Sequence, residues 1–263
     1  MPVDWLDVSS LSFNTLLLLE SVQLSWLPGW LPEGELAIAL RANPVVEWYL
    51  RHKCPQIAGW VDQVMALDQG SPARATREDI RAAEITVMRA MTDLLVYVSD
   101  PAVYDAQPFL AWDTHELTSL VDFSGKVVID VGTGTGRLAL AAAPQAMAVY
   151  AVEPVANLRA FLKEKARRLG FSNVYPADGL ITDLPFADGF ADITLAGHVY
   201  GDEPAAELAE LERVTHTGGM IILCPGNRDQ DNEIHHFLVD RDFDWGRFEE
   251  PRDGWMRKYW KTR

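Results

Sequence analysis

The sequence has few basic residues and no hydrophobic run long enough for a membrane span. It carries 23 Lys plus Arg against 38 Asp plus Glu, a formal net charge of -15. This excess of negative charge repels a polyanion, so we expect no nucleic-acid partner. The uncharged stretch 138–152 is shorter than the roughly 20 apolar residues that span a bilayer, and Pro144 and Gln145 interrupt it. We therefore expect no membrane segment.

Cysteine is also scarce. The two cysteines, Cys54 and Cys224, lie far apart in the sequence, and we interpret both as reduced and buried, which suits a reducing cytosol. Residues 1–7 carry acids where a secretory signal needs bases. With 48% hydrophobic and 23% charged residues, the composition is that of a folded globular protein. We expect the protein to be cytoplasmic.

Residues 1–112 have helical periodicity and predict an all-helical region. The expected helices are 11–26, 34–42, 45–52 and 76–98. Thr76, followed by Asp79 three residues later, is a plausible cap for the last of these. Five tryptophans lie in this region and either fill its core or form an aromatic wall over a substrate: Trp5, Trp26, Trp30, Trp48 and Trp60. We expect the region to cover an acceptor pocket and set its specificity.

From residue 113 the pattern changes to alternating strands and helices. Expected strands at 126–131, 147–152, 173–176, 191–196 and 220–224 alternate with helices at 138–143, 155–169, 204–214 and 232–240. Two more strands, 245–248 and 255–260, are joined by a loop that contains Glu249 and Glu250. Repeated strand–helix units predict an α/β fold for 113–263, with a doubly wound and mostly parallel sheet that binds ligands at the carboxyl ends of its strands.

A glycine-rich loop directly follows the first of these strands. Its sequence is Asp130-Val131-Gly132-Thr133-Gly134-Thr135-Gly136-Arg137-Leu138. Glycines between a strand and a helix let the backbone approach a ligand closely. The loop lacks the Gly-Lys-Ser/Thr of a nucleotide phosphate loop, and Arg137 occupies the place of the last glycine of a dinucleotide fingerprint. A nicotinamide-dependent oxidoreductase is therefore disfavoured, although it remains an alternative.

Acidic residues follow the next two strands. Glu153 lies about 20 residues after Gly132, the spacing at which a carboxylate meets a ribose diol. Asp178 follows the third strand, where an oxygen acceptor could meet an exocyclic amine such as that of adenine. Together with Asp130, these acids suit a cationic ligand. The alternative to a ligand-binding role is that each of these acids is an ordinary solvated residue at the end of a strand.

The order of these elements resembles class I S-adenosylmethionine-dependent methyltransferases. The likeness continues through Phe190-Ala191-Asp192-Ile193-Thr194-Leu195 and Gly218-Gly219-Met220-Ile221-Ile222-Leu223, and covers about residue 116 to the C-terminus. It implies a seven-stranded sheet whose last strand is antiparallel. It also implies that Asp130 and the glycines hold the methionine end of S-adenosyl-L-methionine, Glu153 the ribose and Asp178 the adenine. The cofactor-binding residues expected on this basis are Asp130, Gly132, Thr133, Gly134, Gly136, Glu153, Pro154, Asp178 and Gly179.

His198 and Tyr200, which both lie in the segment after the fourth strand, are candidates for catalysis. His198 would act as a base if the acceptor must lose a proton, and otherwise would be a structural histidine bonded to the backbone. Tyr200 would position the acceptor or merely pack. His235 and His236 are adjacent and point in different directions on a helix, so we expect no metal site.

These features together predict a methyltransferase that acts on a small molecule or a protein. The expected reaction is in-line transfer of the methyl group from S-adenosyl-L-methionine, with proximity and alignment supplying much of the rate. No Asp/Asn-Pro-Pro-Tyr/Phe follows the fourth strand, which argues against a nucleic-acid amine as acceptor. Besides the nicotinamide enzyme, the remaining alternative is a cofactor-binding module that regulates a partner without transferring anything.

Overall fold

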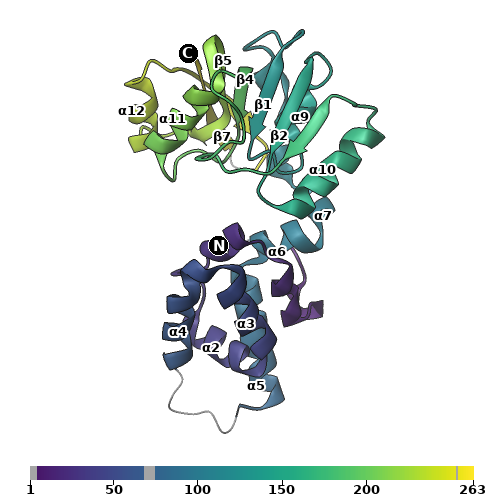
Figure 1. Cartoon of the computed structure of the whole chain (residues 1–263), viewed down its shortest axis with the longest axis vertical. Helices are drawn as coiled ribbons and strands as arrows, with labels where there is room; N and C mark the ends of the chain where they lie inside the picture. Colours follow the sequence, from purple (N-terminus) through teal and green to yellow (C-terminus); the bar gives the residue numbers. More distant parts are fainter. Residues whose placement is uncertain (1–4, 68–74, 253) are drawn as a thin grey trace. The chain divides into compact units, whose positions relative to one another are not determined.

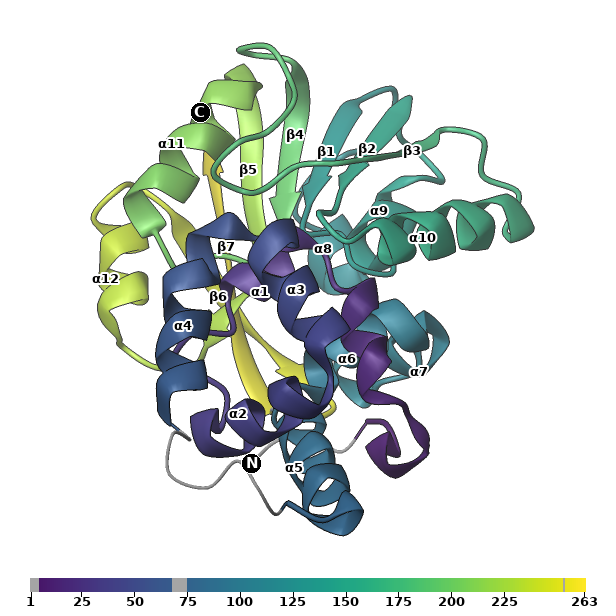
Figure 2. The same ribbon diagram turned by 60° about the horizontal axis from the view of Figure 1, so that its bottom comes forward.

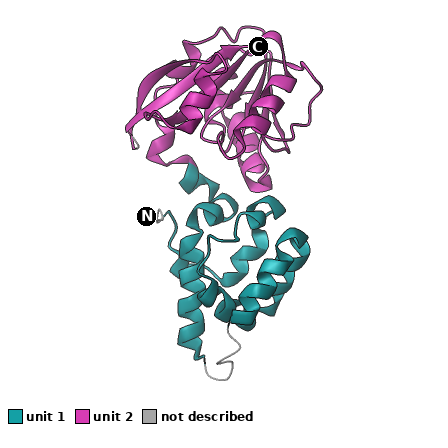
Figure 3. Ribbon diagram, turned by 90° about the vertical axis from the view of Figure 1, so that its left-hand side faces the viewer, with its two compact units in different colours: residues 1–104 teal, residues 105–263 magenta. Residues whose placement is uncertain are grey.

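The computed structural model describes residues 5–67, 75–252 and 254–263 (Figure 1). Residues 1–4, on which the expectation about a secretory signal partly depends, lie outside this range. The chain divides into two compact units, 1–104 and 105–263 (Figure 3). Each unit is described by itself below.

The first unit consists of helices in its described part. Their bounds are η1 Val8–Ser10, η2 Phe13–Leu18, α1 Ser21–Ser25, α2 Glu33–Ala42, α3 Pro44–Lys53, η3 Pro55–Ile57, α4 Ala58–Leu67, α5 Arg77–Ala90 and α6 Thr92–Ser99, followed by α7 Pro101–Asp105 at the division. Thr76 caps α5 as predicted: its hydroxyl accepts from the Asp79 backbone N–H, and the Asp79 carboxylate accepts from the Thr76 N–H. Cys54 is buried and unpaired, as is Cys224 in the second unit.

Two predicted helices of this unit are each broken in the structure. Residues 11–26 form η2 and α1 because Glu20 is extended and starts a new helix, in which the Gln23 side chain accepts from the Glu20 N–H. Residues 76–98 form α5 and α6, since Met91 leaves helical geometry with φ -127° and ψ 27°. α6 is buried on several sides whereas α5 is amphipathic, so the two segments meet different surroundings. Helix α4 has no counterpart among the predictions.

Core filling is the wrong interpretation for three of the five N-terminal tryptophans. Trp26, Trp30 and Trp48 expose 45%, 42% and 58% of their surface. Leucines and valines take the interior positions instead, among them Leu16, Leu24, Leu36, Leu40 and Val61, which are all fully buried.

The second unit is the predicted alternation of strands and helices. It comprises η4 Pro108–Leu110, α8 His115–Thr118, β1 Val127–Val131, α9 Arg137–Ala142, β2 Ala148–Val152, α10 Ala156–Arg168, β3 Val174–Ala177, β4 Ala191–Ala196, α11 Pro204–Val214, β5 Thr215–Arg228, α12 Glu233–Val239, β6 Asp244–Glu250 and β7 Gly254–Thr262. Glu249 and Glu250 belong to β6, so their predicted placement in a loop is wrong. The reason is that β6 pairs with β7 up to Glu250 opposite Gly254.

The seven strands form one sheet in the order β3-β2-β1-β4-β5-β7-β6 (Figure 2). β1 pairs in parallel with β2 and β4, and β7 is antiparallel to both β5 and β6. This confirms the expected doubly wound, mostly parallel sheet of seven strands. The order reverses direction at β1 and β4, and ligands of such sheets bind at the carboxyl ends of the strands around that point.

Alternate residues of the central strands face two separate cores. Val128 and Val149 pack with α8, α9 and α10 on one face, whereas Ile129 and Val131 pack with α11 and α12 on the other. Helices thus cover both faces (Figure 2). Because both faces of the central strands are buried, their sequences are nearly continuous apolar runs. The rigid layers fix the strand ends from which the candidate site is built.

Candidate active site

The predicted acids lie at the carboxyl ends of three neighbouring strands. Val131 of β1 pairs with Val152 of β2, which pairs with Ala177 of β3. Asp130, Glu153 and Asp178 therefore lie along one edge of the sheet. The backbone continues this alignment beyond the strands, since Thr133 N–H donates to Val152 O and Glu153 N–H donates to Ala177 O. The structure brings these three acids into one region.

Three glycines give the loop after β1 its shape. Gly132, Gly134 and Gly136 have φ of 63°, 55° and 90°, in the left-handed region that other residues rarely adopt. A Cβ at Gly132 would lie 2.3 Å from Val199 Cγ1, and a Cβ at Gly136 would lie 2.3 Å from Leu162 Cδ1. Packing inside the protein therefore demands two of the three glycines, in addition to any approach of a ligand.

Asp130 is completely buried beneath this loop. Its Oδ2 accepts from the Thr133 hydroxyl at 2.5 Å and from the Ala139 N–H at 2.9 Å, whereas Oδ1 has no hydrogen-bond partner among the described residues. Burial raises the pKa of Asp130 to about 7, and the neighbouring Glu153 charge acts in the same direction. A buried acceptor without a donor is costly, so Oδ1 is suited to a ligand that brings a donor or a positive charge.

Glu153 braces the glycine loop from the end of β2. Its Oε2 accepts from the Gly134 N–H at 3.0 Å, and its Oε1 accepts from the Val155 N–H at 2.9 Å. The residue is 6% exposed, and burial raises the pKa of its carboxyl group. A carboxylate has about four lone-pair sites, so two remain for the hydroxyls of a ribose. Pro154 follows directly and leads into α10.

Asp178 differs from the other two acids because its side chain is 74% exposed. It forms an ion pair with Arg159 of α10 at 3.0 Å, and the same arginine nitrogen donates to the Glu153 backbone oxygen at 2.5 Å. Arg159 thus links the ends of β2 and β3. Gly179 is required by packing, since a Cβ there would lie 2.9 Å from Pro185 Cδ.

His198 follows β4 and lies beside the glycine loop through its neighbour Val199, which covers Gly132. The His198 Nε2 lies 3.0 Å from Oε1 of Glu250, whose side chain is completely buried. The Phe109 ring meets the imidazole edge-on, with 5.6 Å between centroids. The predicted base therefore has a carboxylate partner on one side and an aromatic wall on another.

Tyr200 directs its hydroxyl into its own loop. It donates to Pro204 O at 2.8 Å, and burial together with the Glu207 charge raises its pKa well above the usual range. The ring packs against the core beneath α11. These contacts are those of a residue that shapes the loop after β4.

Sequence reasoning missed Arg159, Glu250 and Phe109 as members of this site. Arg159 lies one helical turn into α10, and its position next to an acidic strand end was a usable signal. Glu250 was assigned to a loop, where its burial could not be foreseen. Phe109 lies in a short segment with no periodic pattern. Its contact with His198 depends on the tertiary fold.

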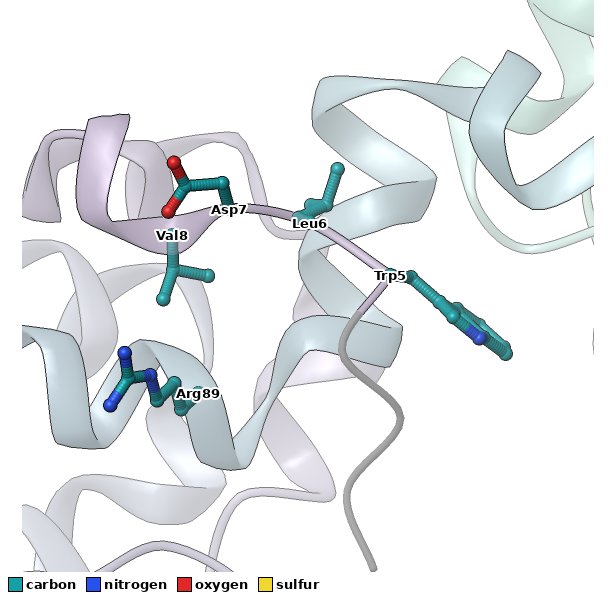
Figure 4. Close-up of a pocket in the computed structure, with 5 residues that line it drawn as sticks. All are labelled: Trp5, Leu6, Asp7, Val8 and Arg89. Atoms are coloured by element: carbon teal, nitrogen blue, oxygen red, sulfur yellow. The ribbon is translucent and has the colours of Figure 1, made fainter.

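A hollow of about 260 Å³ lies elsewhere, in the first unit (Figure 4). Its lining residues are Trp5, Leu6, Asp7, Val8 and Arg89, none of which is a predicted site residue. Within 5–67, 75–252 and 254–263, no three His, Cys, Asp or Glu side chains gather to hold a metal ion. Among the same residues, no helix combines the length and apolar character needed to cross a bilayer.

Comparison with known proteins agrees with this geometry. Residues 129–223 match the family model of a methyltransferase domain, a span that runs from β1 into β5. An uncharacterized methyltransferase from Mycobacterium sp. (strain JLS) is 31% identical over 150 residues, which cover 54% of this chain and 58% of the relative. An uncharacterized methyltransferase from Geobacillus thermodenitrificans (strain NG80-2) is 28% identical over 150 residues, which cover 56% of this chain and 67% of that relative. The chain thus spans about six-tenths of the length of the first relative.

Among solved structures, a SAM-dependent methyltransferase from Aquifex aeolicus aligns with a TM-score of 0.48 and 20% identity. The alignment covers 61% of this chain and 97% of that chain. The matched family span contains every residue predicted to bind the cofactor and also His198 and Tyr200. The family model therefore shows that residues 129–223 are similar to a methyltransferase domain, and the two curated relatives are themselves described as methyltransferases.

Proposed function

We propose that this protein transfers a methyl group from S-adenosylmethionine to a small-molecule acceptor. The observation that carries the proposal is the unpaired Oδ1 of the fully buried Asp130 beneath a loop of left-handed glycines. S-adenosylmethionine carries positive charge on its sulfonium and ammonium groups, and an unpaired buried carboxylate oxygen favours such a ligand. The residues present therefore fit this cofactor.

The nine predicted residues would hold the cofactor as follows. Asp130 and the loop with Gly132, Thr133, Gly134 and Gly136 would face the methionine end. Glu153 would accept from the ribose hydroxyls, while Pro154 turns the chain into α10. Asp178 and Gly179 would meet the adenine, with Arg159 fixing Asp178 relative to the end of β2. When bound, the cofactor supplies an electrophilic methyl group on sulfur.

The chain's own contribution is to orient the acceptor and move a proton. His198 is the residue we propose as proton acceptor because it lies at the end of β4 with 31% of its side chain exposed. A positioned base contributes about 10²–10⁴-fold to a reaction that needs proton removal. Tyr200 would shape the acceptor side by fixing the loop after β4 through its bond to Pro204. The substrate-cap role of 1–112 stays a prediction.

A small molecule is favoured as acceptor over nucleic acid because the net charge is -15. The same charge gives a neutral or cationic acceptor an electrostatic advantage over an anionic one. A protein acceptor is a second candidate, and a peptide array together with a metabolite panel, both read out as S-adenosylhomocysteine released, separates the two.

Calorimetric titration with S-adenosylmethionine and S-adenosylhomocysteine tests the cofactor assignment. We expect both to bind, and Glu153→Ala to weaken binding about 10–100-fold through the loss of charge-assisted hydrogen bonds, each about 1.5–3 kcal/mol. Glu164→Ala is a matched control, because Glu164 lies exposed on α10 and pairs with Arg167. Unchanged affinity in Glu153→Ala would contradict the role of Glu153. Stabilisation by NADH in place of either ligand would favour the oxidoreductase instead.

A further inference from the structure

His198 has a backbone conformation that side chains rarely adopt. Its φ is 60°, one of two positive values among the described non-glycine residues. Its N–H donates to Pro225 O at 3.0 Å, which ties the residue to β5. Strained residues of this kind persist where the surrounding structure holds them, and they concentrate at functional sites. The positive φ of His198 therefore indicates a functional role for its imidazole, whose contacts define that role.

That contact is with Glu250, the last residue of β6. The Glu250 side chain is completely buried, and neither of its oxygens has an aligned hydrogen bond from a described group. Its nearest charged-pair partner is His198 Nε2, 3.0 Å from Oε1. A buried carboxylate that lacks partners is strongly disfavoured unless a charged or donor group compensates it. Nε2 is the ring nitrogen placed to do so.

The remaining surroundings of the imidazole leave its other nitrogen available. Phe109 packs edge-on at an interplanar angle of 83°, which limits rotation of the ring. Within the described residues, His198 Nδ1 has no hydrogen-bond partner. A hydrogen bond at one ring nitrogen determines the state of the other. A proton on Nε2 would lie beside the Glu250 carboxylate, 3.0 Å from Oε1, and would leave the lone pair on Nδ1.

We propose that Glu250 is a positioning residue that holds His198 in the Nε2–H tautomer, so that Nδ1 accepts a proton from a hydroxyl-bearing acceptor. This inference rests on the proposed function and adds the chemical class of the acceptor to it. A neutral amine or a thiolate needs no base before it attacks, whereas a hydroxyl does. A buried carboxylate behind the histidine is therefore accounted for by an acceptor that must lose a proton, and the proposal commits to a hydroxyl and not to an acidic carbon.

The acceptor O–H bond breaks and its proton passes to His198 Nδ1. The oxygen electron pair forms the new O–CH₃ bond, while the S–CH₃ bond breaks and its electron pair stays on sulfur. The imidazolium, stabilised by the Glu250 carboxylate, then gives its proton to water through the exposed side of the ring.

Nitrogen-15 NMR of the full-length protein, with labelled histidine, tests the arrangement without needing the natural acceptor. His198 is assigned by the signal that disappears in His198→Gln, and spectra are taken over a series of pH values so that the tautomer is read from the neutral form of the ring. We expect the wild type to have a protonated-type Nε2 shift and an unprotonated-type Nδ1 shift. In Glu250→Leu, which keeps the side-chain volume, this single-tautomer pattern should be lost.

Glu249→Leu is the matched control, because Glu249 is the exposed neighbour on the same strand. It should leave the pattern unchanged. Should Glu250→Leu fail to fold, Glu250→Gln replaces it, and we expect both tautomers there because an amide donates and accepts. A wild-type His198 protonated at Nδ1, or a Glu250 variant with an unaltered tautomer, would overturn the inference. S-adenosylhomocysteine titration of the same samples separately reports on the proposed function, and we expect Glu250 variants to retain binding.

Discussion

Asp130 and Glu153 are both buried acids, but the protein satisfies them differently. Backbone N–H groups bond to both oxygens of Glu153, whereas one oxygen of Asp130 is left without a donor. The sequence predicted both acids at the site because Asp130 lies at the carboxyl end of one buried strand and Glu153 directly follows the next. It could not predict Glu250, whose burial depends on the pairing of β6 with β7. Residues placed by long-range pairing are those that sequence spacing misses.

The raised pKa of Asp130 predicts a pH-dependent affinity for the cofactor. A cationic ligand stabilises the ionised form, so binding to the free protein should tighten as pH rises through about 7. The α-amino group of the ligand titrates in the wild type and in Asp130→Asn alike. We therefore expect the ratio of wild-type to Asp130→Asn affinity for S-adenosylmethionine to rise about tenfold from about pH 6 to 8. A constant ratio in calorimetry would contradict this role of Asp130.

At the scale of elements, the strands of the second unit were predicted closely except β5, which was expected at 220–224 and extends over Thr215–Arg228, and the helices of the first unit were predicted less well. β4 has the predicted bounds because a mostly apolar run ends at Gly197, and α11 has them because Pro204 occupies its first turn. The breaks at Glu20 and Met91 were not predicted, since helical periodicity continues across both. Only the surrounding packing and the capping pair of Glu20 and Gln23 distinguish two helices from one.

The close contact between Gly132 and Val199 predicts the effect of adding a methyl group to the glycine loop. Gly132→Ala should destabilise the protein by about 1–3 kcal/mol and weaken cofactor binding, because the new methyl group would overlap Val199 and φ is positive. Gly125→Ala is the control, since Gly125 has a similar φ of 71° but nothing lies near its Cβ position. Urea denaturation of both variants separates the steric cost from the conformational cost. Equal destabilisation of Gly132→Ala and Gly125→Ala would mean that the Val199 side chain moves aside without a cost in stability.

At the scale of the whole molecule, each unit has its own set of buried apolar residues. Such units often unfold separately, so we expect two calorimetric transitions. S-adenosylhomocysteine at about 100 times its Kd should stabilise one of them by about 2.7 kcal/mol and leave the other unchanged. The Asp130→Asn variant should show a smaller stabilisation of that transition by the same ligand concentration. A single transition that moves as a whole would indicate that the units unfold together.

The packing of Val199 on Gly132 has a kinetic consequence. Val199 is covalently joined to His198, so any ligand that displaces the glycine loop also displaces the backbone of the proposed base. An acceptor that arrives first would meet an imidazole that has not yet taken up its final place. The enzyme would then follow a compulsory order, with the methyl donor entering before the acceptor and leaving last as its demethylated product, which inhibition patterns would reveal.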